Sequence, residues 1–244
     1  MKTILTMALA AWLVVLMPLQ SLAQGVTEDR VRELVRETLL NDPQILMDAI
    51  AVLEQRAAVA EQQSVATVLQ EQRDLIERDP NAPVLANPEG DVTVVEFFDY
   101  NCPFCRRAMP VVEELIATDA DVRVVYREWP ILGEGSVFAA RAALASREQG
   151  LYEEFHWAMM GMNGRAEEQT VLAIAADLGI DIDQLWTDME APAVDEHIET
   201  SIRLAEMLGI TGTPTFIIGQ ELIPGIVPLE VMEDVIETLR LAAQ

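Results

Sequence analysis

Apolar residues recur at helical spacing near the start of the chain, after residue 26. One face of this stretch carries Val31, Leu34, Val35 and Leu39. Glu28 and Asp29 precede the stripe, where acidic side chains complement the dipole of a helix start. Asn41-Asp42-Pro43 then supplies a capping residue followed by a proline, which is typical of one helix ending and another beginning. The pattern predicts a helix from residue 27 and a second helix from residue 44.

The second helix is predicted over residues 44–76 and carries an apolar seam. The seam positions alternate in steps of four and three residues, as in a coiled coil: Leu46, Ile50, Leu53, Ala57 and Ala60. The seam weakens at residues 61–64 and resumes out of phase at Val65, Val68 and Leu75. Such a stripe is buried either against its own chain or against the same helix of another copy, and we favour the second arrangement.

Prolines and a turn-forming Asn in residues 78–83 cannot continue this helix. We therefore place a domain boundary there, with an N-terminal helical region over residues 24–78 and a linker over residues 79–91. The next apolar run, over residues 92–98, is rich in β-branched and aromatic side chains and predicts a buried strand.

The rest of the chain predicts an α/β domain over residues 92–244. A helix to about residue 118 and a strand at 122–126 complete a βαβ unit, and strand character returns at 215–218 with a pairing segment across Gly219. A last helix is predicted over residues 229–242. Between these parts, an all-helical insert occupies about residues 135–208, with breaks at Gly150, residues 161–164, Gly179 and Pro192.

The first residues have the pattern of a secretory signal peptide. Lys2 gives a positive start, residues 4–16 are almost entirely apolar, and Ser21-Leu22-Ala23 is a small-x-small cleavage site. The apolar stretch is shorter than the roughly 20 residues that span a bilayer. We predict a signal peptide over residues 1–23, cleaved after Ala23, and therefore export.

The charge of the chain excludes one class of partner. Asp and Glu number 41 against 16 Lys and Arg, which gives a formal charge of -25, and Lys2 is the only lysine. Such a surface repels nucleic acid and anionic membranes. We predict no nucleic-acid partner.

The only two cysteines lie in one short window, Cys102-Pro103-Phe104-Cys105. The loop that they close is too small to stabilise the fold much, so the pair is predicted to react. Cys102 follows a predicted strand and begins a helix, where unpaired N–H groups and the helix dipole stabilise a thiolate. We assign Cys102 as the attacking thiolate and Cys105 as the shielded resolving thiol. The redox-active pair needs no other cofactor.

A metal site is the alternative for a C-x-x-C motif, and it needs two more ligands. His156 and His197 are the remaining candidates, but they are not at ligand spacing, and we interpret both as packing or surface residues. The methionines between 158 and 162 are interpreted as core or groove filler rather than copper ligands: Met159, Met160 and Met162. We predict no metal.

The order of strand, C-x-x-C motif, helix, helical insert and Thr213-Pro214 before a strand resembles the DsbA-type branch of the thioredoxin superfamily. Pro110 stands where the family kinks its active-site helix. The segments 97–102 and 129–133 are also similar to those of the branch. The resemblance covers about residues 84–244 and implies a thioredoxin-like fold and thiol-disulfide oxidoreductase activity.

The resemblance implies roles for further residues. Glu96 stands six residues before Cys102, where the family has a buried carboxylate that can move the proton of Cys105; a Glu facing solvent at a sheet edge is the alternative. Pro214 is expected to follow a cis peptide bond and, with Thr213 and Phe104, to bind substrate. Threonine at 213 resembles the isomerase-like members, and Phe104 replaces the histidine of the CPHC motif, which implies a less oxidising couple.

The N-terminal segment 31–43 resembles the ScsC-like proteins, which oligomerise through this region. We therefore expect a homo-oligomer, a trimer rather than a dimer, of a periplasmic thiol-disulfide oxidoreductase that acts on misfolded or mis-disulfided exported proteins. We favour isomerase over oxidase, which implies a membrane partner that keeps Cys102 reduced. The alternative is a copper-binding or chaperone-like periplasmic protein that uses the two thiolates. Glutathione-dependent isomerases of related fold rank last, because they lack the C-x-x-C pair.

Overall fold

The computed structural model describes residues 27–243, so the predicted signal peptide over residues 1–23 lies outside the described residues. Contacts within the chain divide it into two units between Arg56 and Ala57. None of the helices that the structure describes is both long enough and apolar enough to span a bilayer.

The first unit consists of helix α1 (Glu28–Asn41) and the start of helix α2 (Gln44–Glu71). The Thr27 hydroxyl accepts a hydrogen bond from the backbone N–H of Arg30 and so caps α1. Every residue from 27 to 56 is exposed. The exposed side chains include a long apolar series: Val31, Leu34, Val35, Leu39, Leu40, Ile45, Leu46, Met47, Ile50, Val52 and Leu53.

The division at Arg56 differs from the boundary that we placed at residues 78–83. The later part of α2 and the short helix α3 (Arg73–Arg78) belong to the second unit, and the predicted single helix is interrupted at Gln72. Leu69 and Ile76 are buried in a cluster with sheet residues such as Val95 and Phe97. The seam that resumes out of phase therefore packs on its own domain. The predicted linker also contributes structure, because it contains strand β1 (Val84–Ala86).

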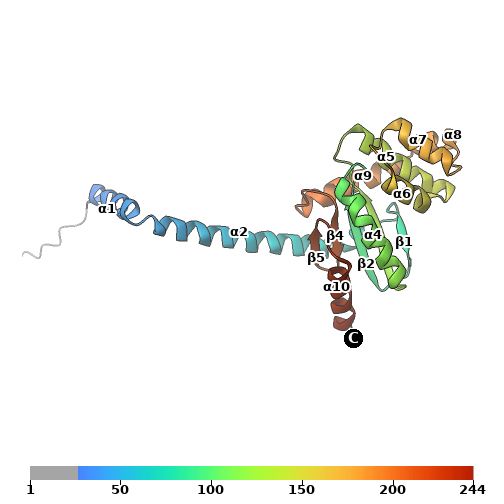
Figure 1. The fold of residues 1–244 in the computed structure, drawn as a ribbon. Coiled ribbons are helices and arrows are strands. Elements are labelled where there is room, and N and C mark those ends of the chain that lie inside the picture. Colours follow the sequence, from blue (N-terminus) through green and yellow to red (C-terminus); the bar gives the residue numbers. More distant parts are fainter. Residues whose placement is uncertain (1–26, 244) are drawn as a thin grey trace, which may run out of the picture. The chain divides into compact units, whose positions relative to one another are not determined.

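A five-stranded sheet with the order β1-β3-β2-β4-β5 forms the centre of the second unit (Figure 1). Strands β2 (Val92–Phe98) and β3 (Val122–Glu128) are parallel and connected through helix α4 (Pro103–Thr118), as predicted. Strand β4 (Thr215–Ile218) is antiparallel to β2, and β5 (Glu221–Pro224) is antiparallel to β4. This topology confirms the predicted thioredoxin-like fold.

Two layers of helices cover the sheet. On one face, helix α4 and the final helix α10 (Leu229–Ala242) pack against Val94 and Phe98 through residues such as Val112 and Ile236. On the other face, α3 and the ends of α2 and α9 (Pro192–Met207) pack against Val95 and Phe97. Because β2 is buried on both faces, its sequence is an almost unbroken apolar run.

The predicted helical insert is present between β3 and β4. It contains α5 (Glu134–Ala145), a 3₁₀ turn η1 (Ser146–Gln149), α6 (Tyr152–Gly161), α7 (Glu168–Asp177), α8 (Ile182–Asp188) and α9. Gly150 and Gly179 separate neighbouring helices with φ values of 70° and 77°, a backbone region that favours glycine. Pro192 opens α9 at its first turn. These breaks fall where the sequence predicts them.

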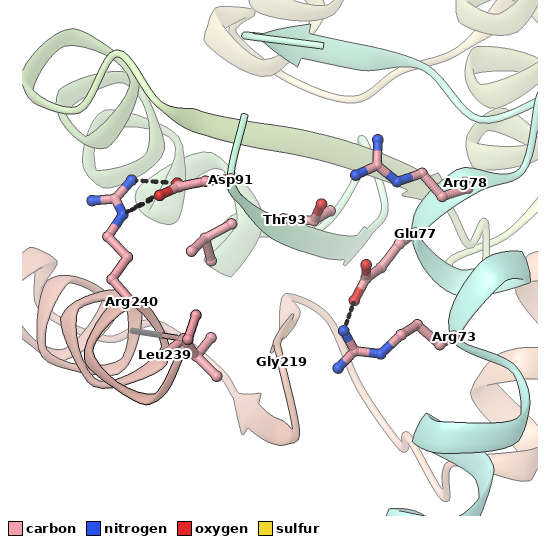
Figure 2. Close-up of a pocket in the computed structure, with 10 residues that line it drawn as sticks. Arg73, Glu77, Arg78, Asp91, Thr93, Gly219, Leu239 and Arg240 are labelled. Carbon is pink, nitrogen blue, oxygen red and sulfur yellow. Dashed lines mark hydrogen bonds and ion pairs between the residues drawn. The ribbon is translucent and has the colours of Figure 1, made fainter. Parts of the chain in front are cut away.

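A cavity of about 570 Å³ lies at the N-terminal end of β2 (Figure 2). Residues of α3, the start of β2, the β4–β5 turn and α10 line this cavity. Arg240 forms ion pairs of 2.7 Å with Asp91 and with Asp119, which tie α10 to the ends of β2 and α4. The cysteines follow the other end of β2, roughly 20 Å away along a seven-residue strand. The cavity is therefore not part of the cysteine site.

Candidate active site

Cys102 is the N-cap residue of α4, and Pro103 occupies the first helical turn. Cys105 lies one turn further along, and both cysteines are free thiols in the structure. The exposed fraction is 4% for Cys102 and zero for Cys105. Cys102 is thus less exposed than we expected of an attacking thiol, because its Sγ lies 3.2 Å from the Thr213 carbonyl oxygen, which accepts a hydrogen bond from Cys102 when the thiol is protonated.

The two thiols have opposite acidities. A hydrogen bond from the Cys105 thiol, opposed by burial, lowers the pKa of Cys102 to about 5; the Thr213 side chain and the backbone N–H groups of Cys105 and Phe104 contribute further. Burial raises the pKa of Cys105 far above its usual range, and the hydrogen bond that it gives to Cys102 adds to this effect. At neutral pH the pair is therefore one thiolate, Cys102, and one thiol, Cys105.

Glu96 lies on β2 between Tyr126 of β3 and Phe216 of β4. Its exposed fraction is 1%, so the alternative of a solvent-facing Glu at a sheet edge is wrong. Burial raises the pKa of Glu96 to about 8, and the negative charge on Cys102 contributes to the increase. No hydrogen-bond partner contacts Oε1 of this carboxyl among the described residues. Glu96 is therefore largely protonated near neutral pH.

The Thr213–Pro214 peptide bond is cis, as the resemblance implied. This segment leads from α9 into β4. The Pro214 carbonyl accepts a hydrogen bond of 2.8 Å from the Gly225 N–H, and the Thr215 hydroxyl donates to the Gly212 carbonyl at 2.8 Å. These contacts fix the Thr213 carbonyl over Cys102, although 111 positions separate the two residues.

Exposed apolar side chains lie on and near the active-site loop. Phe104, between the two cysteines, has an exposed fraction of 51%, and the Arg107 guanidinium lies 4.6 Å from its ring centroid. Ile131 and Leu132 are also exposed, and their N–H groups donate to Asp99, three residues before Cys102, at 2.8 and 2.9 Å. An apolar segment of a substrate would find three apolar contacts here.

The structure brings Cys102, Cys105, Glu96 and Thr213 together. It also places beside them residues that the sequence did not identify as part of the site. Asp99 accepts hydrogen bonds from three backbone N–H groups, those of Asn101, Ile131 and Leu132. The Asn101 side chain exchanges hydrogen bonds with both backbone groups of Ala166 in the insert. An Asp-x-Asn turn before the motif was a usable signal for the first contact, because Asp favours such turns.

Arg106 had no comparable signal in the sequence. Its guanidinium donates hydrogen bonds to the Tyr100 carbonyl at 2.9 and 3.1 Å, and to the Gly164 carbonyl at 2.7 Å. The side chain thus connects the active-site loop with the loop that follows α6.

The two histidines are packing residues, in agreement with our interpretation, and both are fully buried. The Nδ1 atom of His156 lies 3.1 Å from the Tyr100 hydroxyl, and burial lowers the pKa of His156 to about 3, which leaves the ring neutral. His197 lies 2.7 Å from the Glu128 carboxylate. Among residues 27–243, no three His, Cys, Asp or Glu side chains are grouped as a metal site.

Two family models match the chain. The model described as a DSBA-like thioredoxin domain matches residues 93–237, and the model described as the copper resistance protein ScsC N-terminal domain matches residues 28–60. A solved structure of a thioredoxin-like oxidoreductase from Silicibacter pomeroyi is 61% identical, with a TM-score of 0.68, and covers 69% of this chain and 97% of its own. The thiol-disulfide exchange protein α-DsbA2 from Wolbachia pipientis is 30% identical, with the same TM-score, over 74% of this chain and 98% of its own.

Curated relatives include longer proteins. The Na(+)/H(+) antiporter NhaA 3 of Salinispora tropica is 32% identical over 143 residues, which are 57% of this chain. The chain spans 22% of the length of that antiporter.

Proposed function

The chain belongs to the DSBA-like thioredoxin domain family and is a thiol-disulfide oxidoreductase of the DsbA/ScsC type, and from this premise we propose that it rearranges disulfides in exported proteins, as an isomerase ahead of an oxidase. The single observation that carries the proposal is the geometry of the thiol pair: Cys102 lies at the start of α4 with its sulfur against Thr213, and Cys105 is fully buried one turn further along. This arrangement lowers the pKa of Cys102 and raises that of Cys105.

In the proposed reaction, the Cys102 thiolate attacks one sulfur of a substrate disulfide. A mixed disulfide forms between Cys102 and that sulfur, and the other substrate sulfur leaves as a thiolate. The released thiolate can attack a second substrate disulfide, and a substrate thiolate finally returns to the mixed disulfide and regenerates Cys102. This cycle rearranges the substrate without net oxidation.

Cys105 resolves a mixed disulfide that no substrate thiolate has broken. Its sulfur attacks Cys102, the substrate leaves as a thiolate, and the Cys105 proton passes to Glu96. Glu96 can become a base at this step because the charge on Cys102 is one of the causes of its raised pKa. Formation of the mixed disulfide removes this charge, which lowers the pKa of Glu96 and increases its carboxylate fraction when a base is needed.

Substrate binding is proposed at Thr213, Pro214 and Phe104. An extended substrate segment would pair with the backbone at Thr213, beside the attacking sulfur, and place an apolar side chain on Phe104, Ile131 or Leu132. These contacts are not specific for one sequence, which suits an enzyme that acts on many unfolded chains.

Oligomerisation through α1 and the start of α2 is proposed from their exposed apolar residues. A soluble monomer rarely exposes so long an apolar series, and the ScsC N-terminal model matches the same residues, 28–60. We propose a homo-oligomer, a trimer rather than a dimer, located in the periplasm. Several active sites in one particle can hold a substrate while its disulfides are exchanged.

The test is reactivation of a scrambled-disulfide protein by residues 24–244, beside oxidation of a reduced substrate. We expect unscrambling by the wild-type protein. An Ile50→Glu/Leu53→Glu variant should lose oligomers and unscrambling together and retain oxidation, whereas the exposed-charge control Glu54→Gln should retain both activities. Strong oxidation without unscrambling by the wild-type protein would contradict the isomerase assignment and indicate an oxidase.

Copper binding by the two cysteines is a second candidate, because cysteine sulfur is a soft ligand that suits Cu(I) and the matching N-terminal family is described as a copper resistance protein. In that case Cys102→Ser would abolish Cu(I) binding, and the wild-type protein would show no disulfide exchange.

A further inference from the structure

Arg106 lies at the centre of a hydrogen-bond cluster that has no role in the reaction proposed above. It follows Cys105 in the first turn of α4 and is half-buried. Its Nε and Nη2 atoms donate to the Tyr100 carbonyl at 3.1 and 2.9 Å. Its Nη1 atom donates to the carbonyls of Gly164 at 2.7 Å and Met162 at 3.4 Å. Within residues 27–243, Arg106 forms no ion pair, so backbone carbonyls are its main partners.

These acceptors lie on two separate parts of the domain. Tyr100 is two residues before Cys102 on the active-site loop, whereas residues 162–164 connect α6 with α7 in the insert. Asn101 makes a second connection nearby, because its side chain binds Ser136 and Ala166. The backbone N–H of Arg106 also donates to the Cys102 carbonyl at 3.2 Å. The loop that carries Cys102 is thus held between the start of α4 and the insert.

The position of this loop determines how closely the Cys102 sulfur approaches the backbone N–H groups that stabilise its thiolate. The N–H groups of Phe104 and Cys105 stabilise the thiolate only while the sulfur remains over the first turn of α4. A loop that moves by a fraction of an ångström lengthens these hydrogen bonds, and they weaken as they lengthen. The positive charge of Arg106 also stabilises the thiolate, because an opposite charge nearby favours the ionised form.

We propose that Arg106 is a positioning residue for Cys102: by binding the carbonyls of Tyr100, Met162 and Gly164 together, it fixes the Cys102 sulfur over the start of α4 and makes the helical insert part of the thiolate site. Both the planar fork and the charge of the guanidinium are required. A lysine has the charge but cannot donate in fixed directions to three carbonyls.

The consequence is a change in redox equilibrium as well as in thiol acidity. The thiolate exists only in the reduced protein, so weakening it destabilises the reduced form relative to the disulfide. A tenfold loss in thiolate stability would make the disulfide tenfold harder to reduce by glutathione, which corresponds to about 30 mV. This inference rests on the proposed role of Cys102 as the attacking thiolate.

The experiment titrates the reduced protein by the ultraviolet absorbance of the thiolate and measures its equilibrium with glutathione, for Arg106→Gln, Arg106→Lys and Arg107→Gln. Arg107 is the matched control, because it has the same charge in the same helical turn but is exposed and contacts Phe104. Arg106→Gln should raise the pKa of Cys102 by about one unit and shift the glutathione equilibrium about tenfold toward the disulfide. Arg106→Lys should show a smaller shift in the same direction, and Arg107→Gln should remain within twofold of wild type.

Circular dichroism first establishes that each variant is folded, and Arg106→Lys is decisive if Arg106→Gln does not fold. A folded Arg106→Gln protein with the pKa and equilibrium of Arg107→Gln would overturn the proposal. Wild-type values in Arg106→Lys would also overturn it, because charge alone would then suffice. If the wild-type protein itself showed an ordinary thiol pKa near 9, the proposed role of Cys102 would fail first, so the two failures are distinguishable.

Discussion

Glu96→Gln should change the way in which stability depends on pH. The pKa of Glu96 is raised from 4.5 to about 8 by burial, so the folded protein holds this proton over a pH range in which the unfolded chain has released it. The contribution of Glu96 to stability is therefore highest below pH 4.5 and falls as the pH rises toward 8. The fall is about 1.4 kcal/mol per pH unit and about 5 kcal/mol in total, an upper limit because the protein relaxes around the charge.

Cys102 acts in the opposite direction in the reduced protein. Its pKa is lowered from 9.0 to about 5, so the folded protein has released a proton that the unfolded chain still holds between these values. This difference stabilises the folded state as the pH rises from 5 toward 9. The two groups thus partly cancel in the wild-type protein.

Urea unfolding of the reduced protein at pH 5, 6, 7 and 8 separates the two contributions. Relative to wild type, Glu96→Gln should gain about 1.4 kcal/mol per pH unit over this range, and Cys102→Ser should lose stability over the same range. Glu114→Gln is the control, because it removes an exposed carboxyl on α4. A Glu96→Gln variant whose stability runs parallel to wild type between pH 5 and 8 would refute the reasoning, because Glu96 would then be ionised in the folded state.

Three further substitutions test the packing around the site. Asp79→Asn should lower the free energy of unfolding by about 3–5 kcal/mol in urea, because it removes the carboxylate 2.6 Å from the fully buried Arg127. Gly135→Ala should lower the melting temperature by several degrees and the rate of disulfide exchange, since its Cβ would meet the Ala166 carbonyl that binds Asn101; a fully stable and active variant would contradict this contact. Phe104→Ala should raise KM for an unfolded protein substrate and leave the pKa of Cys102 within about half a unit, while an unchanged KM would remove Phe104 from the binding surface.

Local sequence was sufficient for most of the domain. In the run from Val92 to Phe98, apolar side chains point to both faces of the strand, because β2 is buried on both faces. Glycines with positive φ mark the breaks in the insert. The cysteine pair was recognisable because Pro103 and the preceding strand define a helix start. These features depend on neighbours along the chain, and a sequence reports such neighbours directly.

The remaining features depend on contacts between distant segments. The seam of α2 changes phase at Val65, and we favoured packing against another copy for the helix as a whole. The pattern did not reveal that the later part of the seam packs on the sheet of its own chain. Arg106 binds carbonyls up to 58 positions away, and a backbone carbonyl carries no residue-specific signal. Likewise, the burial of Cys102 results from Thr213, which only the folded chain brings to the sulfur.

The most direct test of the central claim is the rate at which the reduced protein attacks an aromatic disulfide, measured from pH 3 to pH 9 for wild type, Cys102→Ser and Cys105→Ser. The account predicts a half-maximal rate near pH 5 in wild type, no attack by Cys102→Ser, and a mixed disulfide that persists at Cys102 in Cys105→Ser. A rate that keeps rising tenfold per pH unit up to pH 9, or attack that survives in Cys102→Ser, would contradict it.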